Sequence, residues 1–186
     1  MEEYTVRVFD SRTEWYQDDK RHRTDGPAIE YKNGSKLWYQ NGKLHRLDGP
    51  ACEYANGTKF WFQNGKYHRM DRPAIEYTNG EKYWYQNGKK HRTDGPAVEY
   101  SNGDKVWYQN GEYHRLDGPA VEYSNGDKYW YKNGKHHRID GPACEWVSGY
   151  KEYWENGKQI QNPNETKEMT VAEISEQLGY NVKVVK

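Results

Sequence analysis

The chain has 186 residues, with 28 basic and 28 acidic side chains, so its formal net charge is zero. This balance gives no strong field that would attract a nucleic-acid backbone or an anionic membrane, so both are disfavoured as partners. The mean hydropathy of −1.37 is typical of disordered chains. However, aromatic residues make up 16% of the sequence, and a Tyr or Trp can bury a large area while its polar edge stays in water. A folded chain that relies on aromatic side chains is therefore expected.

The N-terminal segment predicts a degenerate capping hairpin at residues 1–21. Residues 4–9 alternate like a strand, and residues 14–17 resemble the second strand of the repeats that follow, with Asp18-Asp19 in place of a turn-forming Asn-Gly. The segment lacks a basic stretch followed by an apolar run, and no part of the chain has the ~20 apolar residues of a membrane span. We therefore expect a cytoplasmic protein.

Residues 22–160 contain six copies of a 23-residue phrase. The copies begin at His22, His45, His68, His91, His114 and His137. A fixed period of this size indicates a repeat array, in which each copy is one folding unit and its neighbours supply its core. Cys52 and Cys144 occupy one repeat position, where the other copies carry Ile or Val, so we expect both to be core residues rather than a disulfide pair.

Each repeat predicts two turns of the Asn-Gly type. In one copy, Asn33-Gly34 and Asn41-Gly42 follow β-rich runs at residues 28–32 and 35–40. Asn-Gly between such runs favours a two-residue type I′ hairpin. The sequence therefore predicts an all-β fold, an elongated antiparallel β-meander repeat array.

Two-residue turns would pair Ile29 with Trp38, and strand alternation would then sort the side chains into two faces. The first face would hold Ile29, Tyr31, Trp38, His45 and Leu47. The second face would hold Ala28, Glu30, Leu37, Tyr39, Leu44 and Arg46. We expect the first face to be buried, because it is more uniformly bulky and repeats almost unchanged.

A third turn falls at an Asp-Gly-Pro phrase, and one copy breaks its pattern. Arg72 replaces the glycine that the other copies carry at Gly26, Gly49, Gly95, Gly118 and Gly141. The residue before a proline is pushed towards extended backbone, which Arg can adopt. Glycine at this position is therefore expected to provide space rather than a positive φ.

The C-terminal residues predict a linker at 161–169 and a helix-strand unit at 170–186. Thr170 and Glu173 have the spacing of a capping box, and Gly179 suits a C-terminal cap. Residues 180–185 read as a strand. We expect this small cap to cover the final sheet edge, which would otherwise invite aggregation.

The run at residues 87–111, NGKKHRTDGPAVEYSNGDKVWYQNG, resembles MORN repeats, which have a similar period and combine Tyr, Trp, Asn-Gly, His and Gly in β-hairpins. It is also similar to repeats of bacterial antitoxin-type and phage proteins. The similarity covers roughly residues 12–160, although this chain has His-Arg-x-Asp-Gly-Pro-Ala where a MORN repeat has His-Gly-x-Gly. The resemblance implies a spacer, a dimerisation surface or a protein-binding platform.

No catalytic residue, metal ligand or cofactor is expected. Each His-Arg-x-Asp phrase gives one His per repeat, about 10 Å or more from the next, whereas zinc needs three or four ligands that converge on one point. No nucleophile elbow, phosphate-binding loop or dinucleotide fingerprint occurs, and nearly every polar residue has several copies. We therefore expect no enzymatic activity, and we interpret the His, Arg and Asp side chains as structural ladders.

The positions that differ among the copies indicate a partner-binding surface. The position of Leu37 becomes Phe60, Tyr83, Val106 and Tyr129, and the position of Leu44 becomes Tyr67, Lys90, Tyr113 and His136. Protein interfaces are enriched in aromatic residues and Arg. The candidate partner-binding residues are Phe60, Phe62, Tyr67, Arg72, Tyr83, Tyr85, Tyr113, Tyr129, Tyr131 and His136.

The sequence therefore predicts a non-enzymatic repeat scaffold that binds another protein through an aromatic face. The resemblance implies a sharper version, in which an antitoxin-like or phage anti-defence protein inhibits its partner. Two other functions stay open, a binding module for glycans or single-stranded nucleic acid and a structural, self-associating repeat protein. The variable positions also fit tolerant solvent-facing strand positions equally well.

Overall fold

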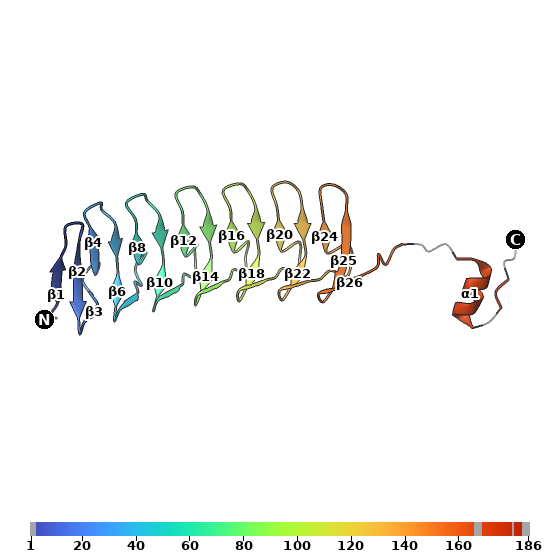
Figure 1. Cartoon of the computed structure of the whole chain (residues 1–186), viewed down its shortest axis with the longest axis horizontal. Coiled ribbons are helices and arrows are strands. Elements are labelled where there is room, and N and C mark those ends of the chain that lie inside the picture. Colours follow the sequence, from blue (N-terminus) through green and yellow to red (C-terminus); the bar gives the residue numbers. More distant parts are fainter. Residues whose placement is uncertain (1–2, 166–168, 180, 184–186) are drawn as a thin grey trace.

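The computed structural model describes residues 3–165, 169–179 and 181–183. These residues form an antiparallel meander sheet of 16 strands, five separate two-stranded hairpins and one short helix. Figure 1 shows the sheet strands along the upper side of an elongated array and the hairpins along its lower side. The predicted all-β meander array of repeated short hairpins is confirmed.

Two strands of each repeat belong to the sheet, and the next two form a hairpin. The sheet contains β1 Thr5–Val8, β2 Arg12–Gln17, β3 Lys20–Arg21, β4 Ile29–Tyr31, β5 Lys36–Leu37, β8 Cys52–Glu53, β9 Lys59–Phe60, β12 Ile75–Glu76, β13 Lys82–Tyr83, β16 Val98–Glu99, β17 Lys105–Val106, β20 Val121–Glu122, β21 Lys128–Tyr129, β24 Cys144–Glu145, β25 Lys151–Glu155 and β26 Lys158–Ile160. The hairpins pair β6 Tyr39–Gln40 with β7 Lys43–Leu44, β10 Phe62–Gln63 with β11 Lys66–Tyr67, β14 Tyr85–Gln86 with β15 Lys89–Lys90, β18 Tyr108–Gln109 with β19 Glu112–Tyr113, and β22 Tyr131–Lys132 with β23 Lys135–His136.

The first Asn-Gly turn of each repeat is one residue longer than predicted. Tyr31 N–H donates to Ser35 O at 2.9 Å and Gly34 N–H donates to Tyr31 O at 3.0 Å, which leaves three residues in the loop. Only Gly34, with φ of 91°, takes a positive φ there, whereas the Asn33 side chain accepts from Ser35 N–H at 2.9 Å. This is a type I turn followed by a left-handed glycine. The second turn has the predicted two residues, because Asn41 and Gly42 both take positive φ and Tyr39 pairs with Leu44.

The longer turn shifts the register by one residue and overturns the predicted faces. Ile29 pairs with Leu37 instead of Trp38, and Glu30 pairs with Lys36. Ile29 is buried together with Ala28, whereas Trp38 is half-buried and Leu47 is 75% exposed. The expectation that Ile29, Tyr31, Trp38, His45 and Leu47 share one buried face is therefore wrong. A one-residue slip in a strand moves each side chain to the opposite face.

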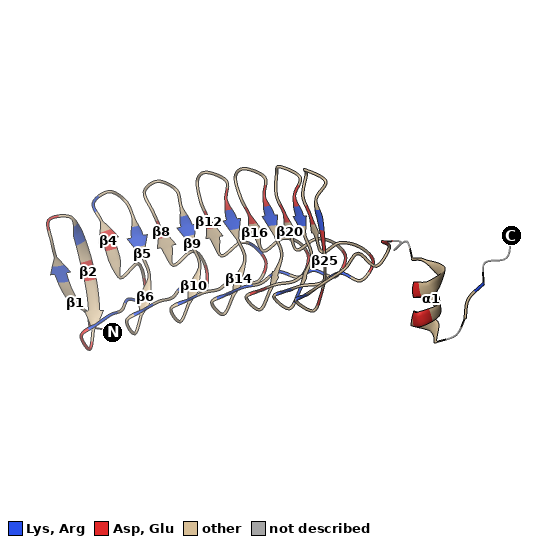
Figure 2. Ribbon diagram, turned by 45° about the vertical axis from the view of Figure 1, so that its right-hand side comes forward, with Lys and Arg blue, Asp and Glu red and all other residues tan. Residues whose placement is uncertain are grey.

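The observed register gives the sheet one charged face and one apolar face. On the charged face, Glu and Lys alternate across the strands, as in the pairs Glu76–Lys82 and Lys82–Glu99. Figure 2 shows acidic and basic residues interspersed along the whole array. The apolar face carries Ile29, Leu37, Cys52, Phe60, Ile75, Tyr83, Val98, Val106, Val121, Tyr129 and Cys144, which pair in this order.

In the five repeats that have a glycine before the corner proline, this glycine provides space, as the sequence predicts. No positive φ occurs at Gly49, and a Cβ added there would lie 2.8 Å from the Arg46 guanidinium carbon. The four equivalent glycines show the same close approach to the arginine of their own repeat.

The two ends of the array differ from its middle. The turn between β2 and β3 uses Asp18 and Asp19, both with positive φ, in place of Asn-Gly. The C-terminal helix α1, Val171–Leu178, has the predicted Thr170–Glu173 capping box and ends at a left-handed Gly179.

The helix does not cover the last sheet edge in the way that we expected. It buries none of its residues, and Figure 1 shows it beyond β26 and away from the sheet. Residues 181–183 form no strand, and residues 180, 184 and 185 of the expected strand lie outside the described part of the chain. Within the described residues, no helix is long and apolar enough to span a membrane.

Candidate functional site: an aromatic groove

Aromatic side chains from the sheet strands and from the residues directly after them form a first row of rings, here called the sheet row. The row consists of Tyr54, Phe60, Tyr77, Tyr83, Tyr100, Tyr123, Tyr129 and Trp146. Neighbouring rings meet edge to face, with centroids 5.3–5.9 Å apart, a favourable geometry for aromatic pairs. The tyrosines that precede the first turn keep part of their rings in solvent, for example Tyr77 with 39% and Tyr123 with 45% exposure.

The hairpins, together with the last strands of the array, supply a second row, here called the ring row. It consists of Phe62, Tyr67, Tyr85, Tyr108, Tyr113, Tyr131, His136 and Trp154. Successive rings in contact are tilted by 30–35° with centroids 4.0–5.5 Å apart. The ring row packs on the apolar face of the sheet. Near the middle of the array, for example, Tyr108, Tyr113 and Tyr131 contact the buried cluster of Val98, Val106 and Val121. Rings of the two rows contact each other at Phe60–Tyr67 and Tyr129–His136, with centroids 6.0 and 6.3 Å apart. The surface that the two rows form together is here called the aromatic groove.

Both rows are interrupted near the middle of the array. In the ring row, Lys90 lies where the neighbouring repeats have Tyr67 and Tyr113, and its Nζ is 4.8 Å from the centroid of Tyr108. In the sheet row, Val106 lies where the neighbouring repeats have Tyr83 and Tyr129. The smaller Val106 side chain lines a cavity of about 390 Å³, which is also lined by Glu81, Tyr100, Ser101, Asn102, Asp104, Tyr108, Tyr113, Val121 and Tyr123.

Four phenols of the groove, those of Tyr67, Tyr83, Tyr85 and Tyr131, stay protonated at neutral pH. Burial raises the pKa of Tyr85 and Tyr67 above the ordinary value, and burial together with nearby groups raises the pKa of Tyr131 to about 12. Burial, followed by a hydrogen bond to Glu81, raises the pKa of Tyr83 as well. The groove therefore offers neutral rings with hydroxyl groups.

The structure brings nine of the ten predicted partner-binding residues into this groove. Phe60, Tyr83 and Tyr129 belong to the sheet row, and Phe62, Tyr67, Tyr85, Tyr113, Tyr131 and His136 belong to the ring row. They are half-buried or, for Phe62, almost fully buried, so they also form the core. Arg72 lies elsewhere, exposed at the corner before Pro73.

Sequence reasoning missed the residues that leave most ring surface exposed in the groove. Tyr54, Tyr77, Tyr100 and Tyr123 occupy the repeat position of Tyr31, which a two-residue first turn places on the buried face. The sequence reasoning also gave no special role to Lys90. The available signal was that Lys90 replaces a ring with a cation at a position that is aromatic in the repeats on both sides.

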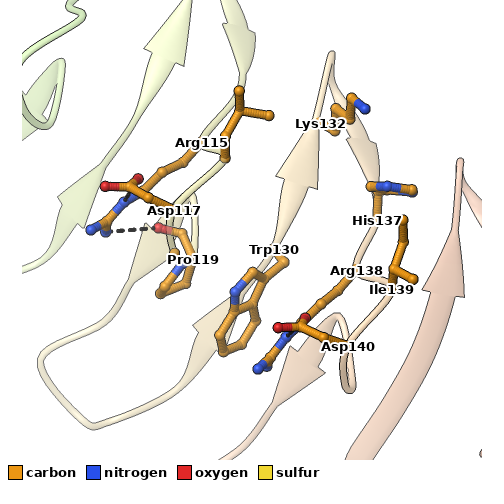
Figure 3. Close-up of a pocket in the computed structure, with 11 residues that line it drawn as sticks. Arg115, Asp117, Pro119, Trp130, Lys132, His137, Arg138, Ile139 and Asp140 are labelled. Carbon is orange, nitrogen blue, oxygen red and sulfur yellow. Dashed lines mark hydrogen bonds and ion pairs between the residues drawn. The ribbon is translucent and has the colours of Figure 1, made fainter.

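The opposite side of the array carries a second repeated feature, the Arg-Trp corner. Arg115 stacks over Trp107 at 4.1 Å and donates to Asp117 at 2.9 Å, to Pro119 O at 3.2 Å and to Glu122 at 2.8 Å. An open cavity of about 660 Å³ lies between this corner and the next one, in which Arg138 stacks over Trp130 at 4.1 Å (Figure 3).

The polar groups of these corners bind one another. Each arginine is held by an aspartate, a backbone carbonyl and a glutamate of its own repeat, with Arg69 more distant from Asp71 than the others are. His45 Nδ1 accepts from the N–H of Asn64, 19 residues further on, at 3.2 Å, and the same bond recurs along the array. Each corner arginine also lies over the tryptophan of the preceding copy, as Arg46 does over Trp38 at 4.0 Å. The corners therefore act as ladders between repeats. Exposed aliphatic residues project beside them at Leu47, Met70, Leu116 and Ile139.

Among the described residues, no group of three or more His, Cys, Asp or Glu side chains is arranged to hold a metal ion. The two cysteines are free and buried, and burial raises the pKa of both thiols to about 12. A thiol of this kind is a poor nucleophile, since the thiolate is the reactive form.

Comparison with known proteins adds no identification. No protein-family model matches the sequence, and a search of curated proteins finds no match.

Proposed function

We propose that the protein is a non-enzymatic repeat scaffold that binds an extended segment of another protein in the aromatic groove. The observation that carries this proposal is the pair of aromatic rows, which run along the array and remain partly exposed. Tyrosine and tryptophan are enriched in protein interfaces, because they give a large contact area at low cost in side-chain entropy. The MORN-like period and the resemblance to antitoxin-type and phage repeats support a version in which the bound protein is inhibited by occlusion.

The packing of the ring row favours a protein partner over a nucleic acid or a glycan. Its rings cover one another at 4.0–5.5 Å, so most of their faces are already occupied and mainly their edges and hydroxyl groups are accessible. Base or sugar stacking requires open ring faces. Edges and hydroxyl groups instead suit contacts with a peptide backbone and apolar side chains.

The proposal is tested by affinity capture with two matched variants. The groove variant, Tyr77→Ser with Tyr123→Ser, removes partly exposed rings, and the control variant, Leu47→Ser with Leu116→Ser, removes exposed aliphatic residues from the opposite side. We expect the wild type and the control to retain one partner that binds saturably when purified, and the groove variant to lose it. Loss of binding in the control variant alone would place the interface on the Arg-Trp corners and refute the groove.

A further inference from the structure

Lys90 and Val106, which interrupt the two aromatic rows, together form one subsite of the groove. Lys90 Nζ lies 4.8 Å from the centroid of Tyr108 and 5.9 Å from that of Tyr83. Tyr108 also lines the cavity above Val106, so the cation and the cavity share a wall. The repeats on either side carry a ring at each of these positions, whereas the first repeat carries Leu37 and Leu44.

Lys90 is a half-buried cation without a counter-ion in the part of the chain that the structure describes. None of the ion pairs between described residues includes it, although each corner arginine has two carboxylate partners. Burial lowers the pKa of Lys90, because water solvates the charged form less well at this half-buried position. A carboxylate bound beside the ammonium group would offset the free-energy cost of burying its charge. The rings of Tyr108 and Tyr83 would still lie near the ammonium group.

The carboxylates at the rim of the cavity are already engaged. Glu81 accepts from the Tyr83 hydroxyl at 3.0 Å, and Asp104 accepts from Ser124 N–H at 2.7 Å. They would repel an acidic group that entered the cavity itself. An acidic ligand group therefore fits beside Lys90, and an apolar one fits above Val106.

We propose that this subsite selects the partner, by binding an acidic residue at Lys90 and a bulky apolar residue in the Val106 cavity. The ligand is an extended protein segment, so this inference rests on the proposed function. Each repeat adds two sheet strands, or about 10 Å, and an extended chain rises about 3.3 Å per residue. The acidic and apolar residues are therefore expected within about three positions of each other.

Residues of the neighbouring repeats can be copied into the subsite to close it, because the same fold already accommodates them. Lys90→Tyr restores the residue of the repeats on either side, and Val106→Tyr restores the residue found at Tyr83 and Tyr129. Lys90→Met removes the charge without adding a ring. Lys89→Met is the matched control, because Lys89 is exposed at the neighbouring position.

The experiment selects a display library of short random peptides on the full-length protein and measures the affinity of the enriched peptides for each variant. We expect enrichment of Asp or Glu within three positions of a bulky apolar residue. Affinity should fall about tenfold or more in Lys90→Tyr, Lys90→Met and Val106→Tyr, and should be unchanged in Lys89→Met.

The experiment distinguishes failure of this inference from failure of the proposed function. Enriched peptides without an acidic bias, which lose affinity in the Tyr77→Ser, Tyr123→Ser variant but not in Lys90→Met, would overturn this inference and leave the proposed function standing. A library that yields no binder, or binders insensitive to every groove variant, would overturn both.

Discussion

Arg69 Nε lies 3.5 Å from Asp71 Oδ1, whereas the same two atoms are 2.8–3.0 Å apart in the other five repeats. This is the repeat in which Arg72 replaces the corner glycine. The close approach found at the other glycines explains the difference, because a Cβ at this position pushes the guanidinium away. Arg69 nevertheless keeps its stack on Trp61 at 4.0 Å and its bond to Pro73 O at 3.2 Å.

Two glycines of one repeat should therefore respond differently to substitution. Gly118→Arg copies the natural Arg72 corner, so we expect it to lower the free energy of unfolding by less than about 1 kcal/mol. Gly126 has φ of 102°, so Gly126→Ala forces an L-residue into strained backbone and should cost more than about 1 kcal/mol. Thermal and denaturant melts of both variants measure the difference. The reverse order of stabilities would contradict the distinction between space and φ at these two positions.

The sequence alone predicts part of this fold, and the two kinds of turn explain why the rest differs. The repeat period is visible in the sequence itself. Local turn chemistry predicts the strand content, the register of the second hairpin and the need for space at the corner glycine. The first Asn-Gly turn has the same two letters but a different geometry, because the Asn33 side chain bonds to Ser35 N–H and leaves the positive φ to Gly34 alone. Nothing in the dipeptide distinguishes Asn33 from Asn41, and the resulting one-residue shift reversed the assignment of the faces.

The candidate site was predictable in its composition but not in its shape. Variation among repeats pointed to Tyr83, Tyr129 and their equivalents, which do line the groove. That these rings pack on one another, and that Lys90 and Val106 interrupt both rows near each other, depends on how the hairpins lie against the sheet. This arrangement is tertiary, so the sequence pattern did not contain it.

The N-terminal hairpin should be sensitive to acid. Burial raises the pKa of Glu14, whose side chain is fully buried, but hydrogen bonds from Arg12, Tyr16 and Arg21 outweigh it and lower the pKa from 4.5 to about 2. A carboxylate with a lowered pKa in the folded state contributes stability above pH 4.5 that is lost as the pH falls from 4.5 towards 2. We expect Glu14→Gln to destabilise the hairpin by about 1–3 kcal/mol at neutral pH and to flatten the pH dependence in this window.

Hydrogen exchange of the β1 and β2 amides, measured between pH 5 and pH 2.5 after correction for intrinsic rates, reports on this hairpin locally. Amides of the central strands β16 and β17 serve as the internal reference. A wild-type hairpin that is no less protected, relative to this reference, at the acidic end of the range would argue against a stabilising role for the Glu14 carboxylate.

Both cysteines should be unreactive in the folded protein. Cys52 and Cys144 are each 2% exposed, and burial raises their pKa to about 12, so little thiolate forms at neutral pH. We expect a thiol reagent to label neither residue under native conditions and both after denaturation. Cys144→Val, which copies the residue of the repeats at Val98 and Val121, should fold normally. Rapid labelling of either thiol in the native protein would show that the apolar face opens readily.

The Arg-Trp corner should contribute to stability through the shape of its guanidinium group. Arg115 binds Asp117, Pro119 O and Glu122 at once while it covers Trp107. A lysine keeps the charge but lacks the planar fork, so it cannot make these contacts together. We expect Arg115→Lys to lower the free energy of unfolding by about 1–2 kcal/mol, with faster hydrogen exchange in β20 and β21 than in β4 and β5. Leu116→Ser, next in sequence and 77% exposed, is the control and should change stability by less than about 0.5 kcal/mol. Equal stability of the two variants would mean that solvent can replace the corner contacts, and that sheet pairing and the aromatic rows are enough to hold neighbouring repeats together.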